Sequence, residues 1–284
     1  MKSPKALCAF AAMAFAAFGV HTASASSIIA EWSFSATNSG PDDTPAPSTD
    51  VTGDATATQL GMTNSYTYAN GEGPGSTAAA DVVSTSGTAD SSFTEDTWRI
   101  RGNSNAKNAG AGNANGWNNS APDYTQGAQF NVSTAGYSNI GLSFDWYCTT
   151  QGVANLQARY SLDGGSTWSN FGSDLIATPN DYYGGAASEP EISMDLSGIA
   201  GANNDPNFEV ELVSVRPVAT DPNYLGASDT NYAAAGGGDY NNNSGNWRFD
   251  NISITGTPAS VPEPASVSLL GLAGMALLKR RRAK

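Results

Sequence analysis

Histidine and cysteine are almost missing from this chain, which has one histidine and two cysteines in 284 residues. His21 and Cys8 both lie in an N-terminal apolar segment that we expect to be removed, so the body keeps only Cys148. Without an imidazole, the body excludes a Ser-His-Asp or Cys-His nucleophile pair and a zinc site built on histidine. We expect Cys148 to be a small buried hydrophobe, with pairing between two molecules as the alternative.

The N-terminal segment has the three parts of an export signal. Lys2 and Lys5 supply positive charge, residues 7–20 are almost continuously apolar, and Ala23-Ser24-Ala25 has the small-x-small pattern of a cleavage site. The sequence therefore predicts a signal helix in residues 1–25 and a body that starts at Ser26.

Positive charge is also scarce. Between residues 26 and 260 there are 25 acidic and 6 basic residues, which gives a formal balance of −19. Such a surface repels nucleic acid and anionic membranes. Divalent cations and neutral sugars remain candidate partners. The alternative is that the acidic surface serves only solubility.

Amphipathic helical patterns are missing as well, and period-two alternation takes their place. Residues 28–35 place Ile28, Ala30, Trp32 and Phe34 on one face, and residues 139–148 alternate in the same way. The other expected strands cover residues 97–101, 128–132, 154–162, 191–196, 207–215 and 246–255. The pattern predicts an all-β fold, an antiparallel β-sandwich of jelly-roll type, over residues 26–256. A tail with a short C-terminal apolar helix follows in residues 257–284.

The last of these strands breaks its own alternation. Trp247 and Phe249 stand at odd positions, whereas Ile252 and Ile254 stand at even positions, so a regular strand would place the two pairs on opposite faces. We therefore expect a β-bulge at Asp250-Asn251. Such a bulge would turn both apolar pairs towards the core.

Two carboxylates on the first and last strands are candidate ligands of a structural calcium ion. The strand pattern resembles that of carbohydrate-binding jelly rolls, which commonly hold such an ion between these strands. The resemblance implies Glu31 and Asp250 as ligands, because calcium prefers hard oxygen atoms. The alternative is that Asp250 caps the bulge or pairs with Arg248 or Arg99.

One turn carries a recognisable motif. The stretch "YSLDGGSTWSNFG" resembles the Asp-box of sialidase-like β proteins, through Ser161, Asp163, Gly165, Thr167 and Trp168. Asp163 can accept backbone N–H bonds across the turn, and the glycines allow positive φ. Since the box occurs once, we expect a structural hairpin and no sialidase activity.

Long Gly- and Asn-rich loops carry aromatic residues that could stack on sugar rings. The candidates are Trp117, Tyr182 and Tyr183, together with Tyr224, Tyr232 and Tyr240. The alternative is that these rings cover the core.

The C-terminal end shows a specific three-part pattern. A Pro-Glu-Pro segment is followed by an apolar run, residues 267–278, and then by a basic cluster; the residues concerned are Val261, Pro262, Glu263, Pro264, Lys279, Arg280, Arg281 and Arg282. This order resembles a PEP-CTERM sorting signal. The resemblance implies export by the general secretory route and processing of the tail by an exosortase.

The apolar run is short for a permanent anchor. Its 12 residues fall below the roughly 17–25 that a stable spanning helix needs. The cations after it would hold the tail in the inner membrane with its end in the cytoplasm. We therefore expect a transient hold followed by release to the cell surface or the extracellular space, with a permanent single-span anchor as the alternative.

Together these patterns predict a non-catalytic surface or matrix protein that is structural or associated with exopolysaccharide. A carbohydrate-binding, lectin-like module is one alternative. A polysaccharide-degrading enzyme is another, because 25 acidic residues offer many carboxylate pairs.

Overall fold

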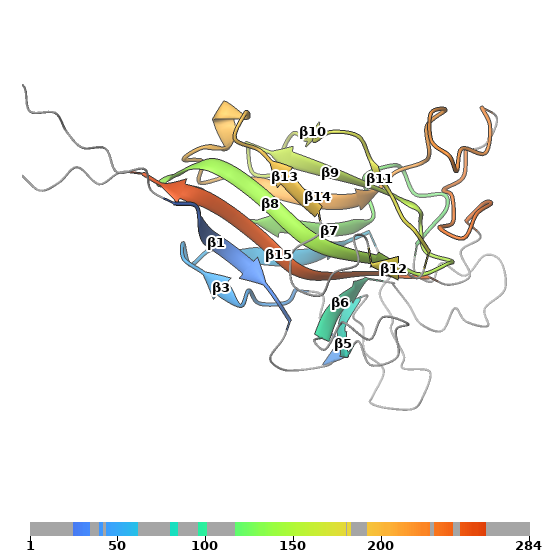
Figure 1. Cartoon of the computed structure of the whole chain (residues 1–284), viewed down its shortest axis with the longest axis horizontal. Helices are drawn as coiled ribbons and strands as arrows, with labels where there is room; N and C mark the ends of the chain where they lie inside the picture. The colour runs from blue at the N-terminus through green and yellow to red at the C-terminus, as the bar shows by residue number, and fades with distance from the viewer. Residues whose placement is uncertain are drawn as a thin grey trace, which may run out of the picture.

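Two antiparallel β-sheets make up the described part of the protein (Figure 1). The computed structural model describes residues 25–34, 40–41, 44–61, 80–84, 96–100, 117–179, 181–182, 192–227, 230–240 and 245–259. The expected signal helix, Tyr183 and the sorting tail lie outside these residues. Within them, no helix is both long enough and apolar enough to cross a membrane.

The larger sheet has nine strands and is built around two long neighbours, β8 (Tyr137–Cys148) and β15 (Trp247–Pro258). Its path runs β12-β8-β15-β6-β5-β2, while β1 pairs with β15 and β3, and β13 pairs with β8. The remaining bounds are β1 Ser27–Trp32, β2 Gly40–Pro41, β3 Thr49–Asp50, β5 Ala80–Ser84, β6 Asp96–Ile100, β12 Asp181–Tyr182 and β13 Ile192–Asp195.

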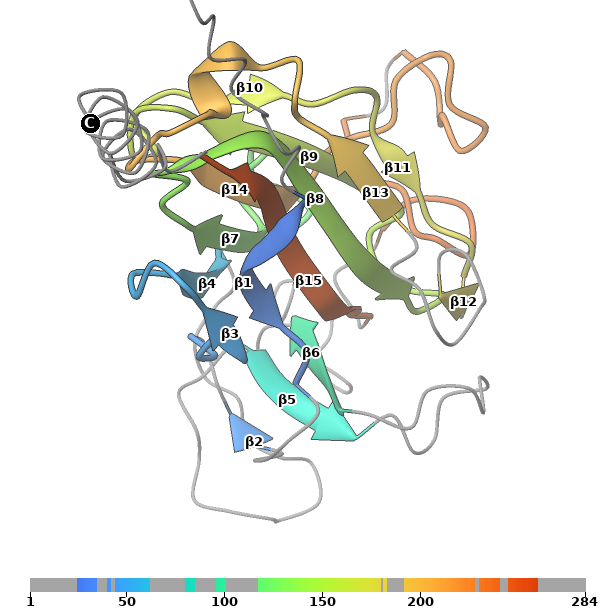
Figure 2. The same cartoon turned by 60° about the vertical axis from the view of Figure 1, so that its left-hand side comes forward.

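The smaller sheet has six strands in the order β10-β9-β14-β7-β4, with β11 paired to β9. Its bounds are β4 Thr56–Leu60, β7 Gly127–Asn131, β9 Asn155–Ser161, β10 Ser169–Asn170, β11 Leu175–Ile176 and β14 Glu209–Ser214. A 3₁₀ turn, η2 (Ala200–Ala202), lies between β13 and β14. Figure 2 shows β7, β9 and β14 on one side of the layer formed by β1, β15 and β8.

Aromatic side chains join the two sheets. The rings of Trp32 on β1 and Phe130 on β7 meet edge to face with centroids 5.1 Å apart. Trp98 on β6 approaches Phe130 in the same way at 6.1 Å. Edge-to-face pairs add to the free energy gained by burying their area. The sheets therefore share one core, which confirms the predicted all-β fold and its two-layer β-sandwich form.

The predicted bulge in the last strand is confirmed. The register of β15 against β8 shifts between Asp250 and Ser253, and Asn251 has a φ of 49°. As a result, all four apolar residues of the strand are fully buried: Trp247, Phe249, Ile252 and Ile254. The extra residue of a β-bulge lets odd-numbered side chains before it and even-numbered side chains after it lie on the same face of the sheet.

The first strand differs from the prediction at Ile28. Its side chain is 39% exposed, whereas the neighbouring Ile29 is fully buried. The reason is a register shift between Ile28 and Ala30 where β1 pairs with β15. The strict alternation expected from the sequence is therefore wrong at this point, because an irregularity in the pairing reverses the faces.

Cys148 is a free, buried thiol at the end of β8, as expected. Burial raises its pKa far above the ordinary value, which keeps the thiol protonated.

Candidate functional site

The aromatic residue chosen as a sugar platform lies inside the protein. Trp117 is fully buried, with its ring centroid 4.3 Å from that of Trp247. The prediction of an exposed sugar-stacking Trp117 is therefore wrong, because a polar, Gly-rich context concealed a core residue. Tyr182 is paired with Tyr147 in the β12–β8 ladder. Its role in sugar binding, like that of Tyr183, stays a prediction.

The Asp-box residues form a hydrogen-bonded turn between β9 and β10. Asp163 accepts hydrogen bonds from the Ser161 hydroxyl at 2.8 Å and from the Thr167 N–H at 2.8 Å, and its other oxygen accepts from the Thr167 hydroxyl at 2.6 Å. These bonds lower the pKa of the Asp163 carboxyl. Gly165 has a φ of 77°, and its carbonyl accepts the Trp168 indole N–H at 3.1 Å.

Two buried glutamates face away from the core on β14. Glu211 forms an ion pair with Arg159 on β9, and Glu209 accepts a hydrogen bond from the Gln129 amide at 3.1 Å. Burial raises the pKa of both carboxyls, and for Glu209 the nearby charge of Asp163 raises it further. Sequence reasoning missed this pair. The sequence clue to this pair was that two glutamates, two positions apart, alternate with apolar residues in one strand.

The two carboxylates expected to bind calcium belong to paired strands. Glu31 on β1 accepts the Thr49 hydroxyl at 3.5 Å. Asp250 on β15 lies opposite Asp145 on β8 and accepts the Asn251 N–H at 2.8 Å. Over the described part of the chain, no group of three or more acidic, cysteine or histidine side chains could hold a metal. The Asn251 contact supports the alternative in which Asp250 caps the bulge.

A polar pocket lies where the segment before β7 meets the segment after β14. Strands β7 and β14 are paired, and backbone hydrogen bonds continue from this pairing into the two segments. The Ser214 N–H donates to the Gln126 carbonyl at 2.8 Å, and the Tyr124 N–H donates to the Ser214 carbonyl at 2.9 Å. The pocket has a volume of about 510 Å³, and the residues lining it are Asn119, Ser120, Arg216, Thr230 and Asn231. We call it the Arg216 pocket.

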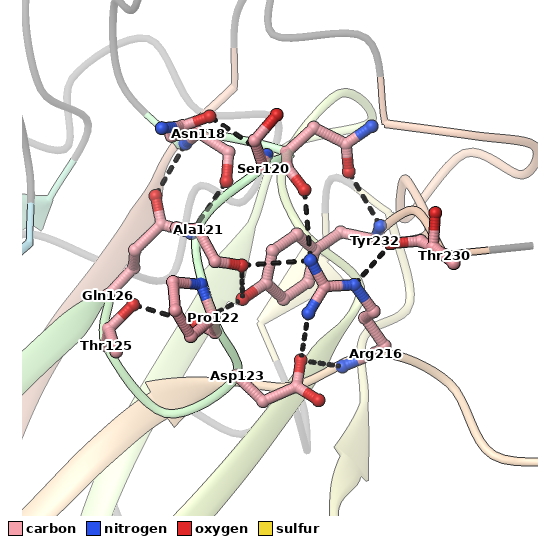
Figure 3. Close-up of polar contacts among 11 residues, drawn as sticks. Asn118, Ser120, Ala121, Pro122, Asp123, Thr125, Gln126, Arg216, Thr230 and Tyr232 are labelled. Carbon is pink, nitrogen blue, oxygen red and sulfur yellow. Dashed lines mark hydrogen bonds and ion pairs between the residues drawn. The ribbon is translucent and has the colours of Figure 1, made fainter.

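The guanidinium of Arg216 holds the pocket together (Figure 3). Nη1 donates to Asp123 Oδ1 at 2.8 Å. Nη2 donates to the carbonyls of Ala121 at 2.9 Å and Asn119 at 3.1 Å, and Nε donates to the Thr230 carbonyl. Four donor contacts from one planar group connect three stretches of chain, which a lysine ammonium could not do in the same geometry.

Tyr232 packs beside this guanidinium and is fully buried. The Arg216 Cζ atom lies 4.4 Å from the ring centroid, which is a cation–π distance. The Tyr232 hydroxyl donates to the Pro122 carbonyl at 2.8 Å. Burial raises the pKa of this phenol, and the charge of Asp123 adds to the effect. Tyr232 is therefore a neutral structural partner of Arg216.

A chain of amides orients the opposite wall. The Tyr232 N–H donates to Asn119 Oδ1 at 2.7 Å, Asn119 Nδ2 donates to Asn231 Oδ1 at 2.8 Å, and Asn231 Nδ2 donates to Asp239 Oδ2 at 3.1 Å. Each amide thus has a fixed orientation before any ligand arrives. Sequence reasoning proposed aromatic residues of the long loops as a sugar platform but missed Arg216. The only sequence clue to Arg216 was that it is one of six basic residues in a strongly acidic body.

The comparison with protein families identifies the tail. The model of the PEP-CTERM protein-sorting motif matches residues 260–282. Such a motif implies export and exosortase-type sorting, with a transient hold at the membrane before release. The match lies wholly in the tail, beyond the two sheets. No curated protein matches the chain.

Proposed function

We propose that this protein is a non-catalytic component of the cell surface or extracellular matrix that associates with exopolysaccharide. Its body would be a β-sandwich of jelly-roll type, and its tail would be removed after export. The observation that carries the proposal is the sorting motif at residues 260–282, attached to an acidic body whose pocket is lined by amides, hydroxyls and the Arg216 guanidinium. Such groups match the hydroxyls of polysaccharides.

Three of the described carboxylates support a non-catalytic role over a polysaccharide-degrading enzyme. Glycoside hydrolysis needs two accessible carboxylates on either side of the scissile bond. Glu209 and Glu211 are buried and engaged with Gln129 and Arg159. Asp123 at the Arg216 pocket is likewise engaged in holding the loops.

Processing of the tail is tested by the mass of the exported protein. We expect the released form to end before the basic cluster Lys279–Arg282, whereas Glu263→Gln should accumulate in the membrane fraction with the tail attached. Ser266→Ala, which leaves the Pro-Glu-Pro segment intact, should be released like the wild type. A released protein with full-length mass would contradict processing.

Association with polysaccharide is tested on the same exported protein. We expect it to sediment with exopolysaccharide purified from the producing cells and to release no reducing ends from it. A protein that stays in the supernatant would remove the exopolysaccharide role. Release of reducing ends would support the enzymatic alternative.

A further inference from the structure

The Arg216 pocket has the size and the stability of a preformed ligand site. Its volume of about 510 Å³ lies within the range of roughly 300–1,000 Å³ typical of small-molecule pockets. The four donor contacts of Arg216 and the amide chain through Asn119 fix the wall groups in place. A preordered wall lowers the entropy cost of binding.

Two hydroxyls at this pocket are available to a ligand. Ser120 and Thr230 have exposed side chains, and within the described part of the chain neither hydroxyl makes a hydrogen bond. The contacts of both residues there run through the backbone: Ser120 N–H donates to Asn118 Oδ1 at 2.9 Å, and the Thr230 carbonyl accepts from Arg216. A hydroxyl both donates and accepts, which suits a ligand that also carries hydroxyls.

Charge selects between neutral and anionic ligands. Among the described residues that line the pocket, Arg216 is the one cation; Asp123 neutralises it, and Asp239 at the end of the amide chain adds a further negative charge. The body as a whole has a formal balance of −19 between residues 26 and 260. An acidic sugar would meet this negative field, and the described lining offers it no cation beyond the already paired Arg216, so the field would repel it.

We infer that the Arg216 pocket binds a neutral, hydroxyl-rich sugar unit of a polysaccharide and discriminates against uronic acids. This inference rests on the proposed exopolysaccharide association and gives it a place on the molecule. Ser120 and Thr230 would contact the sugar directly, and Arg216 is a positioning residue that holds the walls.

The test uses the exported protein on an array of immobilised gluco-, galacto- and manno-oligosaccharides, each beside its uronic acid counterpart. We expect saturable binding to at least one neutral series and binding to its uronate that is weaker by about tenfold or more. Ser120→Trp, which fills the pocket from an exposed position, should weaken the neutral binding by at least about tenfold. Ser193→Trp, the same change at an exposed serine of β13 on the other sheet, should leave the binding unchanged.

The outcomes separate this inference from the proposed function. If the wild type binds no neutral series, or binds a uronate as tightly, the inference is wrong. It is also wrong if Ser120→Trp, with an unchanged melting temperature, binds like the wild type. In each case, sedimentation with exopolysaccharide would leave the proposed function standing, whereas loss of sedimentation by the wild type would remove both.

Discussion

Arg216 and Asp123, which are 93 positions apart in the sequence, form an ion pair in which Nη1 lies 2.8 Å from Oδ1. The same carboxylate oxygen accepts the Arg216 backbone N–H at 3.1 Å. Since the two side chains are 25% and 35% exposed, solvent screens their charge interaction. The hydrogen bonds to backbone carbonyls therefore carry most of the stabilisation, and Arg216 acts mainly as a cross-link between loops.

Replacing Arg216 should loosen two loops at once, the one that contains residues 119–123 and the one that contains Thr230. We expect Arg216→Lys to lower the free energy of unfolding by about 2–3 kcal/mol, because one ammonium cannot reach the same set of acceptors. Thermal unfolding should show a fall of about 5–10 °C in melting temperature. Val218→Ala, at an exposed apolar residue nearby in sequence, is the control and should change the stability by less than about 0.5 kcal/mol. A lysine variant as stable as the wild type would show that the planar fork is not needed.

Trp117 should behave as a core residue. We expect Trp117→Ala to cost about 3–5 kcal/mol, since it removes a fully buried ring that packs on Trp247. Trp117→Phe should cost less because it keeps much of the buried area. Denaturant unfolding of both variants measures these differences. Unchanged stability with a selective loss of glycan binding would instead restore the sugar-platform interpretation.

The Asp-box turn should give a pH-dependent contribution to stability. Hydrogen bonds hold the pKa of Asp163 below its unfolded value, so ionised Asp163 stabilises the fold above that value. This contribution is lost as the pH falls through the lower, folded pKa. We expect Asp163→Ala to have a lower melting temperature than the wild type at pH 7, with a gap that narrows below about pH 4.

Asp163→Asn is the matched control for this turn, because the amide oxygen can still accept the Thr167 N–H. Its gap to the wild type should be smaller than that of the alanine variant. If the difference in melting temperature between Asp163→Ala and the wild type stays constant from neutral to acidic pH, ionised Asp163 does not stabilise the turn.

Ionisation of Glu209 should change stability with pH in the opposite direction to ionisation of Asp163. Burial raises its folded pKa above the unfolded value, so its stabilising protonated form is lost as the pH rises through that interval. We expect Glu209→Gln to raise the melting temperature at pH 7 and to match the wild type below about pH 4, since glutamine can still accept from Gln129.

Glu211→Gln is the comparison, because this change leaves Arg159 largely buried without its charged partner. We expect it to lower the melting temperature at pH 7. Two variants that shift in the same direction would mean that pairing with Arg159 does not distinguish the two carboxylates.

The strands were largely predictable because their signal is local. In a strand, the side chains of neighbouring residues lie on opposite faces. The apolar positions change from odd to even between Phe249 and Ile252, and this change located the bulge in β15. The irregularity at Ile28 was not predictable, because two isoleucines in a row fit either face until the pairing with β15 selects Ile29.

The sequence by itself determined that the chain carries a sorting motif of exported proteins and that its body is all-β. The sorting motif is a continuous stretch, and strand alternation depends only on neighbouring residues. The tertiary structure alone decided that Trp117 is buried, that Arg216 pairs with Asp123, and that the loops line a polar pocket. Those outcomes depend on contacts between residues far apart in the chain, which form only when the two sheets bring their connecting loops together.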